Sequence, residues 1–161
     1  GIIRRETFCS LEEAFTAAFA NNKTVKTAQI EFGEMIGEGA TSQILKSEYN
    51  GQKCAAKCLR KEGETTPQDF LDLMMEIRTL SIIGDHPQIV GFLGASFDIP
   101  QRPIMLLELM DGQTLESYLG AQKPDFNLGR AVVYDWSIDL LSALHFLHDR
   151  DPVILHRDIK P

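Results

Sequence analysis

The pattern of apolar and polar positions changes its period along the chain. Between residues 29 and 59 the apolar positions come in short runs, which is typical of strands, and two glycine-containing turns separate the runs. The second turn, Asn50-Gly51, is a strong hairpin signal because both positions favour a positive φ. The pattern therefore predicts three strands in an antiparallel meander, the second over about 43–49 and the third over about 52–59.

A helical period follows, after a segment with a strong helix start. Thr66 is a hydroxyl cap, Pro67 stands at the first helical position, and Asp69 follows three residues after the cap. The apolar residues that follow share one helical face: Phe70, Leu73, Met74, Ile77 and Leu80. The turn at residues 84–87 contains glycine and proline, and it predicts the end of this helix.

Two more strands and two more helices are predicted beyond residue 88. The strands are expected over 89–97 and 104–109, and a short helix over 114–119. A long amphipathic helix is expected over 128–148, with an apolar seam of Val133, Trp136, Leu140, Leu144 and Leu147. A further short helix is predicted to begin at Ser10, which opens a capping box. Because strands and helices do not alternate, the order predicts an α+β fold of five strands with one inserted helix, then helices.

Composition narrows the class of protein. The chain has 161 residues, 43% of them hydrophobic and 24% charged, which excludes a disordered chain. No apolar run is long enough to predict a transmembrane segment. The net charge of −7 disfavours general nucleic-acid binding. Three cysteines, Cys9, Cys54 and Cys58, indicate free thiols in a reducing compartment.

Gly37-Glu38-Gly39 is the first candidate for chemistry. Glycine lets backbone N–H groups approach a phosphate because it has no Cβ. The turn does not open a helix and its third glycine position is Ser42, so a dinucleotide-binding fingerprint is disfavoured. Taken alone, the turn favours a plain hairpin over a phosphate-binding loop.

Three charged positions are further candidates. Lys57 shares a strand face with Ala55, and Glu76 lies at the margin of the apolar face of the inserted helix, from which it could reach a lysine on the sheet. Asp158 could orient a hydroxyl nucleophile and accept its proton, and Lys160 could steady a transferred phosphate. Each of these residues, taken alone, is also compatible with a solvated surface side chain.

Together and in this order, the features resemble the eukaryotic protein kinase family, over about Ile30 to Pro161. Cys54-Ala55-Ala56-Lys57 resembles the V-A-I-K motif, and His156-Arg157-Asp158 the H-R-D motif. Lys160-Pro161 looks like the serine/threonine form of the catalytic loop, and Phe92 to Ser96 looks like the tyrosine-kinase-like branch. The resemblance implies a five-stranded antiparallel N-lobe with one inserted helix, followed by the first helices of the C-lobe.

The resemblance also implies roles for individual residues. Lys57 would position the phosphates of ATP, and Glu76 would hold Lys57. Asp158 would be the catalytic aspartate, with Lys160 beside it. Leu107 falls at the gatekeeper position, and Glu108 to Met110 at the hinge. The implied ATP-binding residues are Ile36, Gly37, Gly39, Ile44, Ala55, Lys57, Leu107, Glu108 and Met110.

The function that the resemblance implies is transfer of the γ-phosphate of ATP, with Mg²⁺, to Ser/Thr hydroxyls of a protein substrate. We expect an N-terminal extension over 1–29, an N-lobe and hinge over 30–110, and the start of a helical C-lobe over 111–161. A cytoplasmic location, or one on the cytoplasmic side of a receptor, is expected.

The family's magnesium-binding D-F-G motif and the Asn of its catalytic loop do not occur in the sequence, so no metal ligand is assigned. We therefore expect the chain to have negligible phosphotransferase activity alone, and the seam of the 128–148 helix to be exposed. Two alternatives stay open. One is a truncated or pseudokinase-type module that binds a nucleotide or a partner. The other is a small-molecule kinase, which the H-R-D-I-K-P form disfavours.

Overall fold

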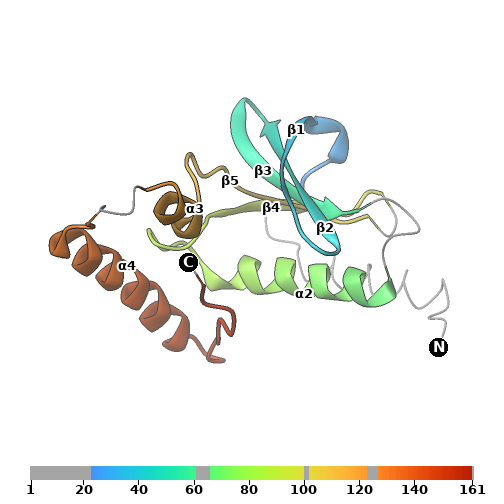
Figure 1. Ribbon diagram of the computed structural model, residues 1–161. Helices are drawn as coiled ribbons and strands as arrows, with labels where there is room; N and C mark the ends of the chain where they lie inside the picture. Colours follow the sequence, from blue (N-terminus) through green and yellow to red (C-terminus); the bar gives the residue numbers. More distant parts are fainter. Residues whose placement is uncertain (1–22, 61–65, 100–101, 123–126, 161) are drawn as a thin grey trace. The chain divides into compact units, whose positions relative to one another are not determined.

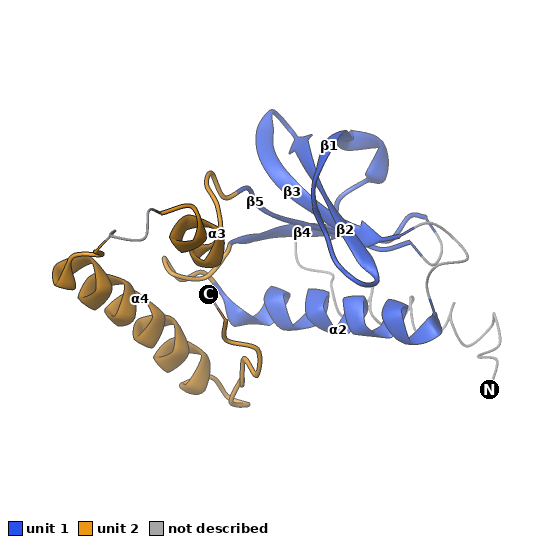
Figure 2. Cartoon of the chain, in the orientation of Figure 1, with its two compact units in different colours: residues 1–84, 91–109 blue, residues 85–90, 110–161 orange. Residues whose placement is uncertain are grey.

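The structure is a computed structural model that describes residues 23–60, 66–99, 102–122 and 127–160 (Figure 1). The predicted helix that begins at Ser10, and Cys9 with it, lie outside the described residues. The chain divides into two compact units (Figure 2). Unit 1 comprises residues 1–84 and 91–109, and unit 2 comprises residues 85–90 and 110–161.

Unit 1 is built on a five-stranded antiparallel sheet with the strand order β1-β2-β3-β5-β4. The strands are β1 (Ile30–Glu38), β2 (Ser42–Tyr49), β3 (Gln52–Leu59), β4 (Phe92–Ser96) and β5 (Ile104–Glu108). Asn50 and Gly51 take φ values of 52° and 77° at the β2–β3 turn, as the predicted hairpin requires. The predicted α+β class and the five strands are confirmed.

Two strand boundaries differ from the prediction. β1 continues through Gly37, which pairs with Ile44, so the turn begins later than expected. The Gly39 N–H closes this turn by donating to the Ser42 carbonyl oxygen at 2.8 Å. β4 begins at Phe92 rather than at Ile89. The amide of Ile89 instead donates to the His86 oxygen at 3.0 Å, because residues 86–89 form a turn.

The helix α2 (Pro67–Ile83) covers one face of the sheet (Figure 1). Thr66 caps it, accepting from the Asp69 N–H at 3.3 Å, and Gly84 with φ 83° follows its last turn. Its apolar face is buried against three strands. The cluster beneath the helix contains Leu59, Phe70, Leu73, Met74, Ile77, Phe92, Ala95 and Met105.

The opposite face of the sheet carries a second apolar cluster. It contains Val25, Ile30, Cys54, Ala56, Ile104 and Leu106. The successive residues 54–56 are all buried, which shows that the central strand β3 is covered on both faces. Cys54 and Cys58 are free thiols, as predicted, and burial raises the pKa of the Cys54 thiol.

Unit 2 contains the helices α3 (Leu115–Gly120) and α4 (Arg130–His148). The rings of Tyr118 and Trp136 join them edge to face, with centroids 6.0 Å apart. The predicted seam of α4 is exposed at Val133, Trp136 and Leu140 and buried at Leu147. Among the described residues, no helix is both long and apolar enough to cross a membrane.

Candidate active site

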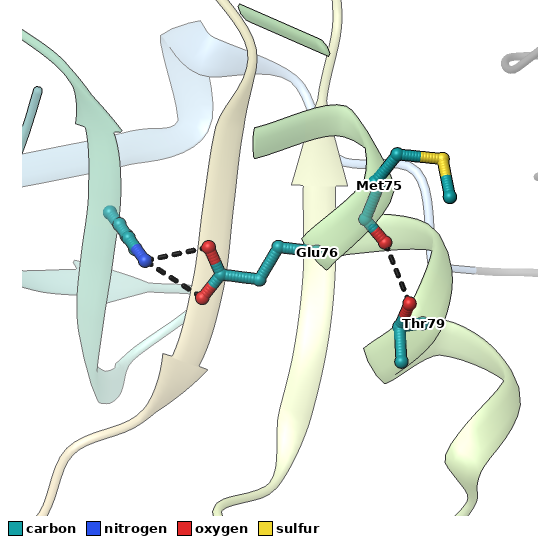
Figure 3. A network of polar contacts seen from close by, with 4 residues as sticks. Met75, Glu76 and Thr79 are labelled. Atoms are coloured by element: carbon teal, nitrogen blue, oxygen red, sulfur yellow. Dashed lines mark hydrogen bonds and ion pairs between the residues drawn. The ribbon is translucent and has the colours of Figure 1, made fainter. Parts of the chain in front are cut away.

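Lys57 on β3 and Glu76 on α2 form a bidentate ion pair. The Lys57 Nζ lies 2.6 Å from Glu76 Oε2 and donates to Oε1 at 2.7 Å. Figure 3 shows the Glu76 side chain reaching from its helix toward the sheet. In the same view the Thr79 hydroxyl donates to the Met75 carbonyl one turn earlier in the helix, at 2.8 Å. The side chains of Lys57 and Glu76 are 22% and 40% exposed, so both charges stay within reach of solvent and of a ligand.

The packing of α2 explains why this pair forms. Met74 and Ile77, on either side of Glu76 in the sequence, are fully buried against the sheet. Glu76 therefore lies at the margin of the buried face, where its carboxylate can reach β3. The sequence predicted this reach from helical geometry, and the structure brings the two residues together.

The other residues predicted around the nucleotide gather on neighbouring strands. Ile44 on β2 pairs with Gly37 on β1 and with Lys57 on β3, so these three stand in one cross-strand row. Ala55 pairs with Leu107 on β5. The row places the glycine-rich turn, an aliphatic side chain and a cation on adjacent strands. The remaining positions are Ile36 in β1, Gly39 in the following turn, Glu108 at the end of β5, and Met110 in unit 2.

The predicted hinge begins at a fixed point of unit 1. The Glu108 N–H donates to the Gly91 oxygen at 2.8 Å, and the Gly91 N–H donates to Glu108 Oε2 at 3.2 Å. This double link is not visible in the sequence pattern. It fixes the end of β5 through both the backbone and the side chain of Glu108.

Asp158 and Lys160 lie in unit 2, after α4. Lys160 Nζ is 2.9 Å from Asp158 Oδ2, and both side chains are 72% exposed. The Asp158 N–H donates to His156 Nδ1 at 3.3 Å, and Arg157 between them takes φ 63°. An ion pair this exposed contributes little to stability, so its two charges are available to another group.

The two predicted pairs belong to different compact units. Lys57 and Glu76 are in unit 1, and Asp158 and Lys160 are in unit 2. In the part of the chain that the structure describes, no three His, Cys, Asp or Glu side chains are grouped so that they could hold a metal ion.

Comparison with known families shows to which family the chain belongs. The family model described as "Protein kinase domain" matches residues 30–161. The chain belongs to the protein kinase family. The match covers every residue of the kinase site proposed from the sequence, from Ile36 to Lys160.

Two of the three relatives described next are named as serine/threonine-protein kinases. The serine/threonine-protein kinase VIK of Arabidopsis thaliana is 31% identical over 146 residues, which cover 85% of this chain and 31% of the relative. Serine/threonine-protein kinase TNNI3K of Mus musculus is 27% identical over 135 residues, 84% of this chain and 16% of the relative. A mitogen-activated protein kinase kinase kinase 7-like protein of Drosophila melanogaster is 30% identical over 141 residues, 86% of this chain and 34% of the relative. The chain thus spans about a third or less of these relatives, and the family predicted from the sequence is confirmed.

An ion pair that the sequence analysis missed ties down the glycine-rich turn. Arg60 NH2 lies 3.0 Å from Glu38 Oε1, and the Arg60 N–H donates to the Thr41 oxygen at 3.1 Å. One signal for this pair was present in the sequence, because Glu38 at the centre of the turn and Arg60 directly after β3 carry opposite charges. Both links hold the turn against the end of β3.

We predict that Arg60→Ala loosens the turn without removing a phosphate ligand. Because the pair is partly exposed, we expect a loss in ATP affinity of no more than about five-fold, with faster exchange of the Gly39 amide. Hydrogen exchange and isothermal titration measure these two effects, and Arg78→Ala, at an exposed position of α2, is the control. A loss as large as that expected for a direct phosphate ligand would contradict this role.

Proposed function

We propose that this kinase domain is the ATP-binding portion of a protein kinase that transfers the γ-phosphate of ATP to Ser/Thr hydroxyls of protein substrates. The observation that carries the proposal is the Lys57–Glu76 pair beside the Gly37–Ile44 row. A lysine held by a helix carboxylate next to a glycine-rich turn is the arrangement with which protein kinases hold ATP phosphates. The serine/threonine specificity is supported by the names of the relatives and by Lys160 beside Asp158.

Each residue has a chemical task in this proposal. Lys57 donates to phosphate oxygens from a position that Glu76 fixes, which lowers the cost of orienting a flexible ammonium. Ala55 and Ile44 offer small and aliphatic surface to a flat base. Asp158 orients the acceptor hydroxyl and takes up its proton, and Lys160 offers a positive charge to the transferred group.

ATP fits the groups that unit 1 presents. Lys57 is accessible, and the end of β5 is rigidly held at Glu108. The Mg²⁺ that protein kinases use neutralises phosphate charge when it is bound. The described residues provide no group of ligands for it, so we assign no residue to the metal.

The test is a transfer assay on the longest natural protein that carries this sequence. With labelled ATP and Mg²⁺, we expect phosphoserine or phosphothreonine in a protein acceptor such as casein, and loss of about 100-fold or more in Asp158→Asn. Asp135→Asn, on the exposed side of α4, should leave the rate unchanged. Transfer only to small-molecule acceptors, or transfer that Asp158→Asn does not affect, would contradict the proposal. ATP binding without any transfer would favour a nucleotide-binding regulatory module.

A further inference from the structure

Residues 23–29, here called the strap, run along β4 before the family match begins at residue 30. Thr24 forms a parallel bridge with Ala95, the Val25 N–H donates to the Ala95 oxygen at 2.9 Å, and the Ala95 N–H donates to the Lys23 oxygen at 2.8 Å. The short 3-10 helix η1 (Thr27–Gln29) then leads into β1. Because β4 is the last strand of the sheet, the strap pairs an edge that would otherwise be open.

The strap is fitted closely to this edge. A Cβ added at Gly94 would lie 2.6 Å from the Lys23 oxygen and 2.9 Å from Val25 Cγ1, so only glycine allows the approach. Val25 is 4% exposed and belongs to the apolar cluster opposite α2. Lys23 Nζ donates to the Phe92 oxygen at 3.0 Å and lies 5.3 Å from the centre of the Phe92 ring.

A small polar cluster fastens the far end of the strap. The Thr27 N–H donates to Asp98 Oδ2 at 3.0 Å, and the Thr27 hydroxyl donates to Asp98 Oδ1. The Ser96 hydroxyl donates to the same carboxylate at 2.6 Å and lies 2.7 Å from the Thr27 hydroxyl. Burial alone would raise the pKa of Asp98, but the hydrogen bonds from Ser96 and Thr27 lower it, so the charged carboxylate is the form that the cluster holds.

The strap contacts Phe92 and Ala95, and both residues belong to the buried cluster beneath α2. Ala95, to which the strap is bonded on one side, packs in the cluster beneath α2 with Met74 and Ile77. Those two residues flank Glu76 in the helix. Ala95 therefore shares a buried cluster with the helix face from which Glu76 extends to Lys57.

We propose that the strap is a positioning device for α2, and that Thr27 and Asp98 are positioning residues for the Lys57–Glu76 pair. A negative charge at Thr27 would face the Asp98 carboxylate within hydrogen-bond distance and would release the strap, because like charges repel. The part of this proposal that concerns ATP rests on the proposed function. The part that concerns the position of α2 does not.

Hydrogen exchange on the full chain tests whether the cluster of Thr27, Ser96 and Asp98, here called the lock, holds the strap in place. In Thr27→Glu we expect the amides of Val25 and Ala95 to exchange at least about ten-fold faster, because a charge-assisted lock is replaced by repulsion. Thr27→Ser, which keeps the hydroxyl, should restore the wild-type rates. Thr24→Glu is the matched control, since it places the same charge three residues away on an exposed side chain of the same strap. Unchanged exchange at Val25 and Ala95 in Thr27→Glu would overturn the lock.

The coupling to the site has its own readouts. With the strap released, we expect faster exchange of the amides of Met74 and Ile77, and faster acylation of Lys57 by an amine reagent, because Glu76 no longer holds the ammonium steadily. Amides of the β2–β3 hairpin serve as the reference for global unfolding. The coupling between the strap and α2 would be overturned if the strap amides exchanged faster while the exchange of the Met74 and Ile77 amides and the acylation of Lys57 stayed unchanged.

A steric variant checks the same proposal without charge. Gly94→Ala should expel the strap and give the same pattern as Thr27→Glu, whereas Gly120→Ala, where an added Cβ meets nothing within 4 Å, should not. ATP affinity separates this proposal from the proposed function. Failure of the wild type to bind ATP would contradict the proposed function alone, since the exchange and acylation results still decide the role of the strap.

Discussion

Replacing Lys57 with methionine is expected to weaken ATP binding by about 10- to 100-fold, because each charge-assisted bond to phosphate is worth about 1.5–3 kcal/mol. Methionine keeps most of the length and the apolar stem of lysine, so the change removes mainly the charge. Isothermal titration of ATP into wild type and variant measures the effect.

Lys53→Met is the matched control for this result. Lys53 lies on the same strand as Lys57, but its side chain is exposed and it pairs across the sheet with Glu48. We expect its affinity for ATP to stay within about two-fold of wild type, as for other surface substitutions. Equal losses in the two variants would mean that general charge, and not the position of Lys57, attracts the nucleotide.

Replacing Ile77 with alanine is expected to lower the free energy of unfolding of unit 1 by about 2–5 kcal/mol. Ile77 is 0% exposed and packs in the cluster beneath α2, so the change leaves a cavity between the helix and the sheet. Urea denaturation followed by circular dichroism measures the loss. Because the cavity adjoins Glu76, we also expect weaker ATP binding under conditions where the variant is still folded.

Ile82→Ala is the control on the same helix. Ile82 is 60% exposed, and alanine is a better helix former than isoleucine, so its free energy of unfolding should change by less than about 0.5 kcal/mol. If both variants unfolded at the same urea concentration as wild type, the cluster beneath α2 would not be the core that holds the helix to the sheet.

Local signals predicted the elements that hold the site. Asn50-Gly51 fixed the β2–β3 hairpin because its turn needs two positive φ values, and both are present. The cap at Thr66 and Asp69 marked the start of α2, and the helical period placed Glu76 at the edge of its buried face. These features depend on neighbours in the sequence, which is why they could be predicted.

Apart from the Lys57–Glu76 pair, the contacts between distant residues that are described above were not predicted. The pairing of β3 with β5 joins Ala55 to Leu107, and no periodicity within either strand specifies it. The strap was missed because its bonds run from Val25 to Ala95, and its lock from Thr27 to Asp98. Thr27 and Asp98 are short polar residues that belong to no apolar pattern, so only the folded chain shows that they meet. β4 was predicted too long because the apolar Ile89 and Val90 next to it look like strand residues.

The central claim is that a nucleotide binds with its phosphates at Lys57, and labelling with an acyl phosphate of ATP tests it most directly. Such a probe transfers its acyl group to an amine that lies beside the bound phosphates, and mass spectrometry of the peptides identifies which lysine has reacted. Our account predicts that the labelling falls on Lys57 and on Lys160, the two lysines assigned to the phosphates, and that excess ATP protects both. We expect Lys46 and Lys53 to react slowly and without protection. Labelling of Lys46 and Lys53 as strong as that of Lys57, or labelling of Lys57 that ATP does not prevent, would contradict the account.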